Sequence, residues 1–311
     1  MSEKPHLLIP GAAPPAGATA SPPLPSNLRA LLQMLAPGER IECDEHSPSP
    51  PYELALARAH GLPSEPGRIP WAAFETGTAG QPCAWVHPCH WQVGADHVLL
   101  SPAGLLSLDE PTSRELMAAM APYFLEDGIA LHYLPGQPGR WLAIGETFCD
   151  LVTMALDRVA GRRLTPSFFN GSGNAAALLR RLQNEMQMLL YTHPATEARQ
   201  RQGLVPVNSF WVTGAGELAR PPSPAAGVQL ENRLHTAAAQ ADAAAHAQAW
   251  NDVDAQCCAP LLARLRAGAE VRLTLCGEHA AQTWGPARSG GWRRAAGALG
   301  LQRTTLEALA L

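Results

Sequence analysis

Two acid–histidine pairs are candidate metal ligands. Asp242 and His246 are four residues apart in an alanine-rich stretch, and in a helix this spacing places both side chains on one face. Glu278 and His279 follow the apolar segment 271–275, which we expect to be a strand. Carboxylate and imidazole groups bind divalent metals, so the four side chains would form one hard-metal or zinc site if helix and strand meet. Taken alone, the pairing of Asp242 with His246 has the alternative that both are ordinary solvated side chains.

A second set of metal-binding residue types lies in the segment CAWVHPCH, residues 83–90. Two Cys and two His crowd into it, and both types bind zinc. Their spacing matches neither a zinc finger nor a zinc ribbon, and Pro88 stiffens the middle. We therefore predict a folded loop with buried thiols rather than a zinc site. The sequence contains neither a G-x-S-x-G nor a P-loop motif, so it supports neither an α/β-hydrolase nor a P-loop NTPase.

Alternating helix and strand signals surround these residues. The apolar segments 6–9, 207–213 and 271–275 are typical of strands, and the last two end in turns that contain glycine. The strongest helix signal covers 174–192, where apolar residues recur at every third or fourth position. The Ala-rich segment 236–250 is strongly helical by propensity. This mixture of helices and strands predicts an α/β fold.

The stretch YTHPATEARQRQGLVPVNSFWVTGAG, residues 191–216, joins two of these elements. It contains a helix end, a short basic helix at 195–202 that Gly203 terminates, a turn, and the strand 207–213. The strand stops in Gly214-Ala-Gly216, and α/β proteins place ligands at the ends of their strands. The stretch is therefore a candidate for holding a ligand.

Length and composition narrow the classes of protein. With 311 residues the chain is long enough for two lobes, and its net charge of −4 provides no basic surface for nucleic acid. The first apolar run is too short for a signal peptide, and no run approaches the roughly 20 apolar residues that span a bilayer. Seven cysteines without a C-x-x-C pair are typical of reduced thiols. We expect a cytoplasmic protein without nucleic-acid or membrane partners.

The stretch 191–216 resembles a segment of the archaeal-type cofactor-independent phosphoglycerate mutases, which has the pattern H-P-x-x-x-x-R-x-x-x-G-x-x-P-x-N, then an apolar strand and G-x-G. These enzymes belong to the alkaline-phosphatase superfamily, whose α/β core uses two metals. A wider resemblance is to bacterial proteins known as phosphoglycerate-mutase-like or RpfE-type regulatory proteins. It is carried by the segments CHWQVGADHVLL, RWLAIGE, LQNEMQMLLYTHP, VPVNSFW and VRLTLCGEH.

The resemblance to the mutases implies a metal site. The family's D-x-x-x-H metal motif falls on Asp242 and His246, and its late Asp-His pair falls on Glu278 and His279, with Glu in place of Asp. The resemblance thus implies a divalent metal, manganese or zinc, bound by these four side chains.

Arg199 and Asn208 are the ligand-binding residues that the resemblance implies, since the matching segment of the mutases is associated with substrate. A guanidinium binds phosphate through two parallel hydrogen bonds, so we expect Arg199 to face a cleft beside the strand 207–213. A surface salt bridge is the alternative for this residue. The implied partner is a phosphorylated small molecule.

Three parts of the mutase site have no counterpart. Where the family has its first metal-binding Asp, the chain reads Ile9-Pro10-Gly11; no Ser or Thr matches the nucleophile; and no histidine follows His279. A phosphomutase must form a phosphoenzyme on an activated hydroxyl, with two metals that clamp the transferred group. The chain therefore lacks central parts of that chemistry, and we assign no catalytic residue.

We therefore expect a reduced alkaline-phosphatase-like α/β core with a second, smaller lobe. Residues 1–311 would form a single phosphoglycerate-mutase-like unit, with 85–205 forming much of the second lobe. The predicted function is that of a cytoplasmic regulatory or ligand-binding protein on a degenerate scaffold, without mutase activity, whose partner is a phosphorylated small molecule or a protein. Two alternatives are a metal-dependent phosphoryl-transfer enzyme, either a phosphatase or a phosphoglycerate mutase, and a purely structural partner-binding domain.

Overall fold

The computed structural model describes residues 4–15, 24–94, 98–101, 103–164 and 173–286. The chain divides into two units, and most of the second is inserted into the path of the first. Unit 1 comprises residues 1–46, 50–62 and 224–311, and unit 2 comprises residues 47–49 and 63–223. The range 85–205, assigned from the sequence to a second lobe, falls entirely within unit 2.

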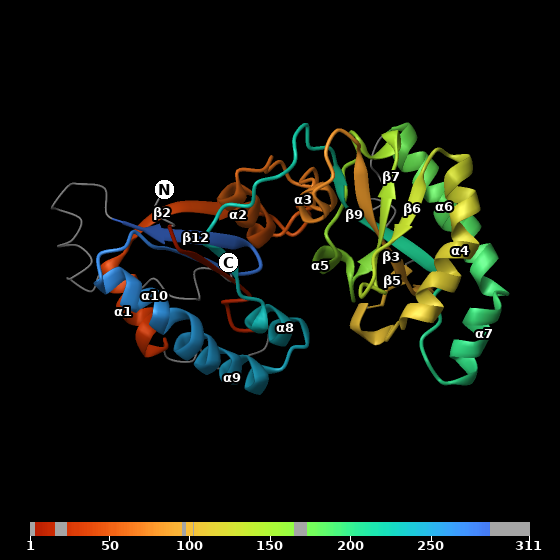
Figure 1. The fold of residues 1–311 in the computed structure, drawn as a ribbon. Coiled ribbons are helices and arrows are strands. Elements are labelled where there is room, and N and C mark those ends of the chain that lie inside the picture. The colour runs from red at the N-terminus through yellow and green to blue at the C-terminus, as the bar shows by residue number, and fades with distance from the viewer. Residues whose placement is uncertain (1–3, 16–23, 95–97, 102, 165–172, 287–311) are drawn as a thin grey trace. The chain divides into compact units, whose positions relative to one another are not determined.

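A five-stranded mixed sheet forms the centre of unit 1 (Figure 1). Its strands, in spatial order, are β10 (Val228–Leu230), β1 (His6–Pro10), β11 (Arg272–Cys276), β12 (Ala280–Gly285) and β2 (Ala36–Glu42). The first three are parallel, and β12 and β2 are antiparallel to their neighbours. Pro10 pairs with Cys276, so β1 and β11 end at the same edge of the sheet.

Helices cover both faces of this sheet (Figure 1). They are α1 (Ser26–Met34), α9 (Ala243–Val253) and α10 (Ala259–Arg266) on one face and α2 (Pro51–His60) on the other, with α8 (Arg233–Ala239) after β10. A π-helical turn, Asp254–Cys258, joins α9 to α10. The Asp254 carboxylate accepts hydrogen bonds from the backbone N–H groups of Asn27 and Leu28, at 3.2 and 2.8 Å, and so caps α1.

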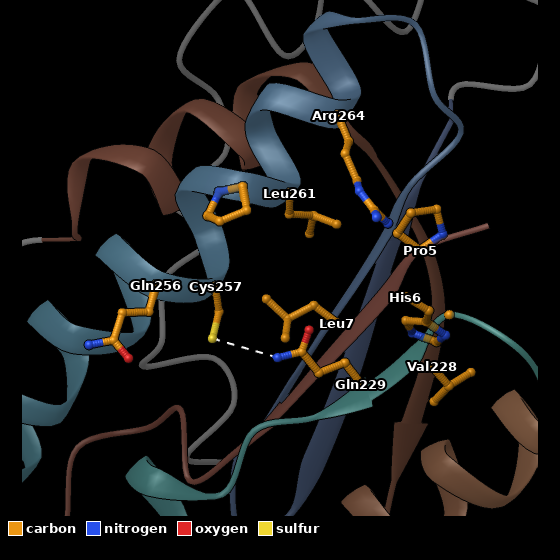
Figure 2. Close-up of a pocket in the computed structure, with 11 residues that line it drawn as sticks. Pro5, His6, Leu7, Val228, Gln229, Gln256, Cys257, Leu261 and Arg264 are labelled. Atoms are coloured by element: carbon orange, nitrogen blue, oxygen red, sulfur yellow. Dashed lines mark hydrogen bonds between the residues drawn. The ribbon is translucent and has the colours of Figure 1, made fainter. Parts of the chain in front are cut away.

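The cover of the first face is incomplete where β10 lies beside β1. A hollow of about 430 Å³ remains there, between the two strands, the π-helical turn and α10 (Figure 2). Gln229, Cys257 and Arg264 contribute polar groups to its lining, and Leu7 and Leu261 contribute apolar ones.

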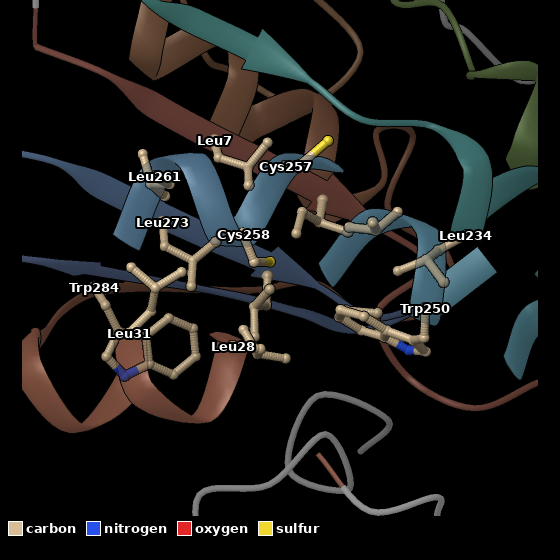
Figure 3. Packing of buried hydrophobic residues seen from close by; sticks show 14 of the residues in the cluster. Leu7, Leu28, Leu31, Leu234, Trp250, Cys257, Cys258, Leu261, Leu273 and Trp284 are labelled. Atoms are coloured by element: carbon tan, nitrogen blue, oxygen red, sulfur yellow. The ribbon is translucent and has the colours of Figure 1, made fainter. Parts of the chain in front are cut away.

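The core of unit 1 lies between the sheet and α1, α9 and α10. Leu7 and Leu273 from the sheet, Leu31 from α1 and Trp250 from α9 are all buried in it (Figure 3). All five residues of β1 are buried, as expected for a parallel strand with helices on both faces. The same packing holds the end of β11, after which the candidate ligands Glu278 and His279 follow.

Unit 2 is built on an antiparallel four-stranded sheet. The order is β6 (Ala130–Tyr133), β7 (Trp141–Ile144), β3 (Cys83–Cys89) and β9 (Ser209–Gly216). α4 (Glu110–Glu126) and α6 (Asn174–Tyr191) pack in the core on one face, and α3 (Trp71–Thr76) packs on the other. Successive side chains of β3 alternate between the faces: Ala84 and Val86 lie in the first core, and Cys83 and Trp85 lie against α3.

Smaller elements complete unit 2. A three-stranded sheet contains β4 (Trp91–Val93), β5 (Val98–Leu100) and β8 (Arg163–Leu164). The short helices α5 (Leu156–Val159) and α7 (Pro194–Arg201) precede β8 and β9. Of the helices that the structure describes in both units, none combines the length and the apolar character needed to cross a membrane.

The α/β class predicted from the sequence is confirmed, since the described chain mixes helices with parallel and antiparallel strands. The strands expected at 6–9 and 271–275 are β1 and β11, and the long helix expected at 174–192 is α6. The single helix expected at 236–250 is wrong, because α8 ends at Ala239 and α9 begins at Ala243. Between them Ala241 adopts the left-handed conformation, with a φ of 53°, which interrupts the helix.

Candidate functional site

The carboxyl edge of β1 and β11 in unit 1 is where the predicted metal ligands lie. Gly11 follows β1 with a φ of +70°, and a Cβ atom there would come within 2.7 Å of the His235 Cα. Only glycine therefore allows α8 to pack this closely. His246 of α9 is 2% exposed, and its Nε2 lies 2.8 Å from the Gly11 carbonyl oxygen. Because a carbonyl only accepts, Nε2 of His246 carries a proton and donates to Gly11.

Asp242 precedes the first helical residue of α9, and its side chain binds backbone N–H groups there. It is the N-cap of α9, and its Oδ1 accepts hydrogen bonds from the backbone N–H groups of Ala244 and Ala245, at 3.0 and 2.9 Å. The prediction of a shared face assumed an uninterrupted helix. The break at Ala241 instead makes Asp242 the first residue outside α9, where a carboxylate satisfies free backbone donors.

Glu278 and His279 form the tight turn between β11 and β12. The Gly277 N–H donates to the Ala280 carbonyl at 2.8 Å, and the His279 carbonyl accepts from the Cys43 N–H at 2.8 Å. The Glu278 side chain is exposed, and that of His279 is half-buried. The turn thus follows the strand that ends beside β1, at the edge where His246 binds Gly11.

The predicted ligand set does not assemble into a metal-binding group. Among the residues that the structure describes, no three His, Cys, Asp or Glu side chains gather closely enough to hold a metal ion. Asp242 and His246 both have backbone partners, and Glu278 and His279 project from a turn. Metal binding by Asp242, His246, Glu278 and His279 stays a prediction.

Arg199 of α7 is a buried structural residue in unit 2. It is 4% exposed, its Nε donates to the Val205 carbonyl at 3.0 Å, and its Nη2 donates to the Leu106 carbonyl. Burial lowers the pKa of the guanidinium, and the nearby carboxylate of Asp109 opposes this shift. Arg199 therefore neither lies in open solvent nor forms a surface salt bridge: it joins α7 to the segments before β9 and α4.

Asn208, nine residues after Arg199, also uses its side chain to bond to backbone groups. Its Oδ1 accepts from the Trp91 N–H at 2.7 Å, and its Nδ2 donates to the Trp91 carbonyl at 2.9 Å. The side-chain amide thus imitates a paired strand residue for Trp91 at the start of β4. The Asn208 backbone N–H donates in addition to the Cys89 carbonyl at 3.1 Å. Asn208 links the two sheets of unit 2.

The segment 193–216 is the part of the stretch 191–216 that begins at His193. Other residues of this segment also contact backbone. His193 Nδ1 accepts from the Ala195 N–H at 3.2 Å and caps α7, and Gly203 ends that helix with a φ of +71°. Gly214 has a φ of +62°, and a Cβ atom there would lie 2.9 Å from the Trp71 Cβ. The strand end that the sequence marks as a ligand site is therefore occupied by the first residues of α3.

The segment CAWVHPCH is a strand with buried thiols. Cys83 and Cys89 are buried, as predicted, but the segment forms β3 rather than a folded loop. Burial raises the pKa of Cys83 to about 11, and burial and then the charge of Arg140 lower the pKa of His87 to about 3. His87 Nε2 lies 2.8 Å from Thr213 Oγ1. A zinc-bound thiol must lose its proton, which the burial of these thiols opposes.

A polar group beside the hollow of unit 1 is not apparent from the sequence. Glu231 follows β10, is 8% exposed, and pairs with Arg233 at 2.7 Å. The Cys257 thiol donates to the same carboxylate at 3.3 Å. These residues have no motif spacing, since Glu231 and Cys257 are brought together only by the packing of β10 against the π-helical turn. The sequence shows only that Cys257 and Cys258 are adjacent, which does not identify Glu231 as a partner.

The comparisons with known proteins give distant likenesses. No family model matches the chain, and no curated protein matches it significantly. The cofactor-independent phosphoglycerate mutase from Thermoplasma acidophilum DSM 1728 is 13% identical, with a TM-score of 0.35, over 93% of this chain and 90% of that chain. The PH0037 protein from Pyrococcus horikoshii is 12% identical, with a TM-score of 0.42, over 92% and 88%. At these values the likeness is one of fold at a distance, and it transfers neither residues nor activity.

Proposed function

We propose that the chain is a regulatory or ligand-binding protein on a phosphomutase-like scaffold that does not interconvert phosphoglycerates. The observation that carries this proposal is the position of Arg199, whose guanidinium is buried and bonded to two backbone carbonyls. A phosphate-binding arginine must present two parallel N–H donors to the anion. Arg199 would have to leave Val205 and Leu106, and expose their carbonyls, before it could do so.

The unit 1 residues agree with this proposal. Asp242 caps α9, and β1 ends in Pro10-Gly11, where the resemblance calls for a metal-binding carboxylate. A phosphomutase also needs an activated hydroxyl, and the sequence offers no match for it. The scaffold therefore supports binding better than phosphoryl transfer.

A coupled assay tests the proposal. Purified full-length protein is incubated with 2- or 3-phosphoglycerate and added Mn²⁺ or Zn²⁺, beside an active cofactor-independent mutase as a positive control. We expect no interconversion by this chain. Turnover in the usual enzyme range, about 1–10³ per second, would contradict the proposal.

The second candidate is a metal-dependent phosphoryl-transfer enzyme at the carboxyl edge of β1 and β11. The pairing of Pro10 with Cys276 favours it, because His246 and the Glu278-His279 turn then lie at one edge of the sheet. Elemental analysis and hydrolysis of p-nitrophenyl phosphate test this candidate. Stoichiometric manganese or zinc, lost together with phosphatase turnover in His246→Ala, would favour the enzyme over the binding protein.

A further inference from the structure

The hollow beside β10 has the size and lining of a small-molecule site (Figure 2). Its volume of about 430 Å³ lies within the range of such sites, roughly 300–1,000 Å³. Leu7 of β1 and Leu261 of α10 give it apolar walls. Gln229 Nε2 points to Cys257 Sγ, 3.8 Å away, and Arg264 reaches from α10 toward Pro5. Apolar walls with a few placed polar groups are typical of ligand pockets.

The hollow is separate from the candidate metal edge. It is lined by Pro5 to Leu7, at the amino end of β1, whereas His246 binds Gly11 after the carboxyl end of the strand. Gly11 lies four residue steps after Leu7, which is about 13 Å of extended chain. A molecule in the hollow therefore does not need the edge residues.

Among the residues that line the hollow, Arg264 is the one with a permanently cationic side chain. Glu231 and Arg233 neutralise each other at 2.7 Å, and hydrogen bonds from Arg233 lower the pKa of Glu231 to about 2. Burial and the same carboxylate raise the pKa of Cys257, which remains a neutral thiol. The side chain of Arg264 forms no ion pair or hydrogen bond with any residue that the structure describes. The described lining of the hollow therefore carries a positive charge at Arg264.

The wall that carries Cys257 is held in a fixed position. It belongs to the π-helical turn Asp254–Cys258, and π-helical turns within α-helices often accompany functional sites. Asp254 anchors this turn to the start of α1 through Asn27 and Leu28. A preformed wall reduces the ordering that a ligand must impose.

We propose that the hollow binds a small amphipathic anion, whose charged headgroup pairs with Arg264 and whose hydrocarbon body lies against Leu7 and Leu261. This inference rests on the proposed ligand-binding function and gives that function a site. The headgroup is a carboxylate or a phosphate monoester, because the planar guanidinium pairs with either through two N–H donors.

The headgroup is tested with two probes, octanoate and octyl phosphate, titrated into the full-length protein by calorimetry. We expect saturable binding at one site. The probe that binds with the higher affinity identifies the preferred headgroup. Arg264→Gln should weaken that binding by about fivefold, as for an exposed ion pair. Arg266→Gln is the matched control, since Arg266 is an exposed residue of the same helix outside the lining, and it should bind as the unchanged protein does.

The apolar walls are tested with neutral and shorter probes. Octanamide should bind more weakly than octanoate and equally well to both proteins, the unchanged one and Arg264→Gln. From butanoate to octanoate, the affinity should rise by about fourfold for each methylene that the hollow buries. No saturable binding of either anion, equal losses in the two arginine variants, or an affinity independent of chain length would each overturn the proposal.

The phosphoglycerate assay on the same preparations separates the two proposals. Absent anion binding together with absent mutase turnover overturns the role of the hollow alone. Mutase turnover overturns the proposed function, whatever the hollow binds.

Discussion

The segment 193–216 of unit 2 and the hollow of unit 1 differ in what their polar side chains bind. In the segment, His193, Arg199 and Asn208 each bond to backbone groups. At the hollow, the Arg264 side chain bonds to no described residue. The segment carries the most specific motif of the sequence, and the hollow carries none. Spaced His, Arg, Gly and Asn residues therefore mark positions with specific partners, and those partners can be backbone atoms as well as a ligand.

Removing the Arg199 guanidinium tests the first half of this comparison with the largest expected effect. Arg199→Met keeps the apolar stem but removes two charge-assisted hydrogen bonds to the Val205 and Leu106 carbonyls. Each such bond contributes about 1.5–3 kcal/mol, so the free energy of unfolding should fall by about 4 kcal/mol. Urea unfolding followed by far-UV circular dichroism measures it.

Arg201→Met is the matched control for this variant. Arg201 is exposed at the end of the same helix, and its replacement should change the free energy of unfolding by less than about 0.5 kcal/mol. If Arg199→Met and Arg201→Met unfold alike, Arg199 is not a structural link, and a ligand role for it gains support.

A pH titration compares the two units through similar His–Thr pairs. His6 lies 2.8 Å from Thr274 in unit 1, as His87 does from Thr213 in unit 2. Burial, then the charges of Arg272 and His60, lower the pKa of His6 from 6.5 to about 4. The unfolded chain therefore binds the proton first, and the contribution of His6, about 3 kcal/mol, is present above pH 6.5 and lost as the pH falls to about 4.

The variant His6→Gln isolates this effect, because glutamine can bond to Thr274 but does not titrate. The difference in unfolding free energy between the two proteins should change with pH only between about 4 and 6.5. A difference that is constant across this range would mean that His6 is not buried as a neutral imidazole.

Asn208→Ala tests the link between the two sheets of unit 2. It leaves the Trp91 N–H and carbonyl without their side-chain partner, which should lower the free energy of unfolding by about 2 kcal/mol. Hydrogen exchange reports the loss directly, since the Trp91 amide should exchange faster. Asn184→Ala, on the exposed face of α6, should leave that amide unchanged. If the Trp91 amide exchanges at the same rate in both variants, the Asn208 side chain does not bond to it.

The elements most predictable from the sequence are those that bury one face, or both faces, along their whole length. The apolar spacing of 174–192 predicts α6, and the apolar run at 6–9 predicts β1, because burial imposes these patterns directly. The sequence does not predict β2, whose residues are mostly exposed and include Pro37 and Gly38. An edge strand has one unpaired side and needs no continuous apolar pattern.

The candidate site was less predictable for a related reason. The spacing of Asp242 and His246 has its meaning only if the helix is continuous, and alanine-rich composition gives no sign of the break at Ala241. Likewise, the sequence identifies Arg199 as a residue with a specific partner but not the carbonyls that it binds. The partners of a polar side chain depend on tertiary packing, which local patterns do not contain.

The smallest expected effect concerns Asp242, and it distinguishes a helix cap from a metal ligand. As the N-cap of α9, Asp242 accepts from two backbone N–H groups, so Asp242→Ala should lower the free energy of unfolding by about 1 kcal/mol. Serine caps helices nearly as well as aspartate, so Asp242→Ser should recover most of that loss. A metal ligand behaves differently, because alanine and serine would both remove the carboxylate and lower the metal content equally. Unfolding and elemental analysis of the two variants therefore give opposite patterns for the two roles. A loss of bound manganese or zinc in both variants, with no recovery by serine, would restore Asp242 to the metal site.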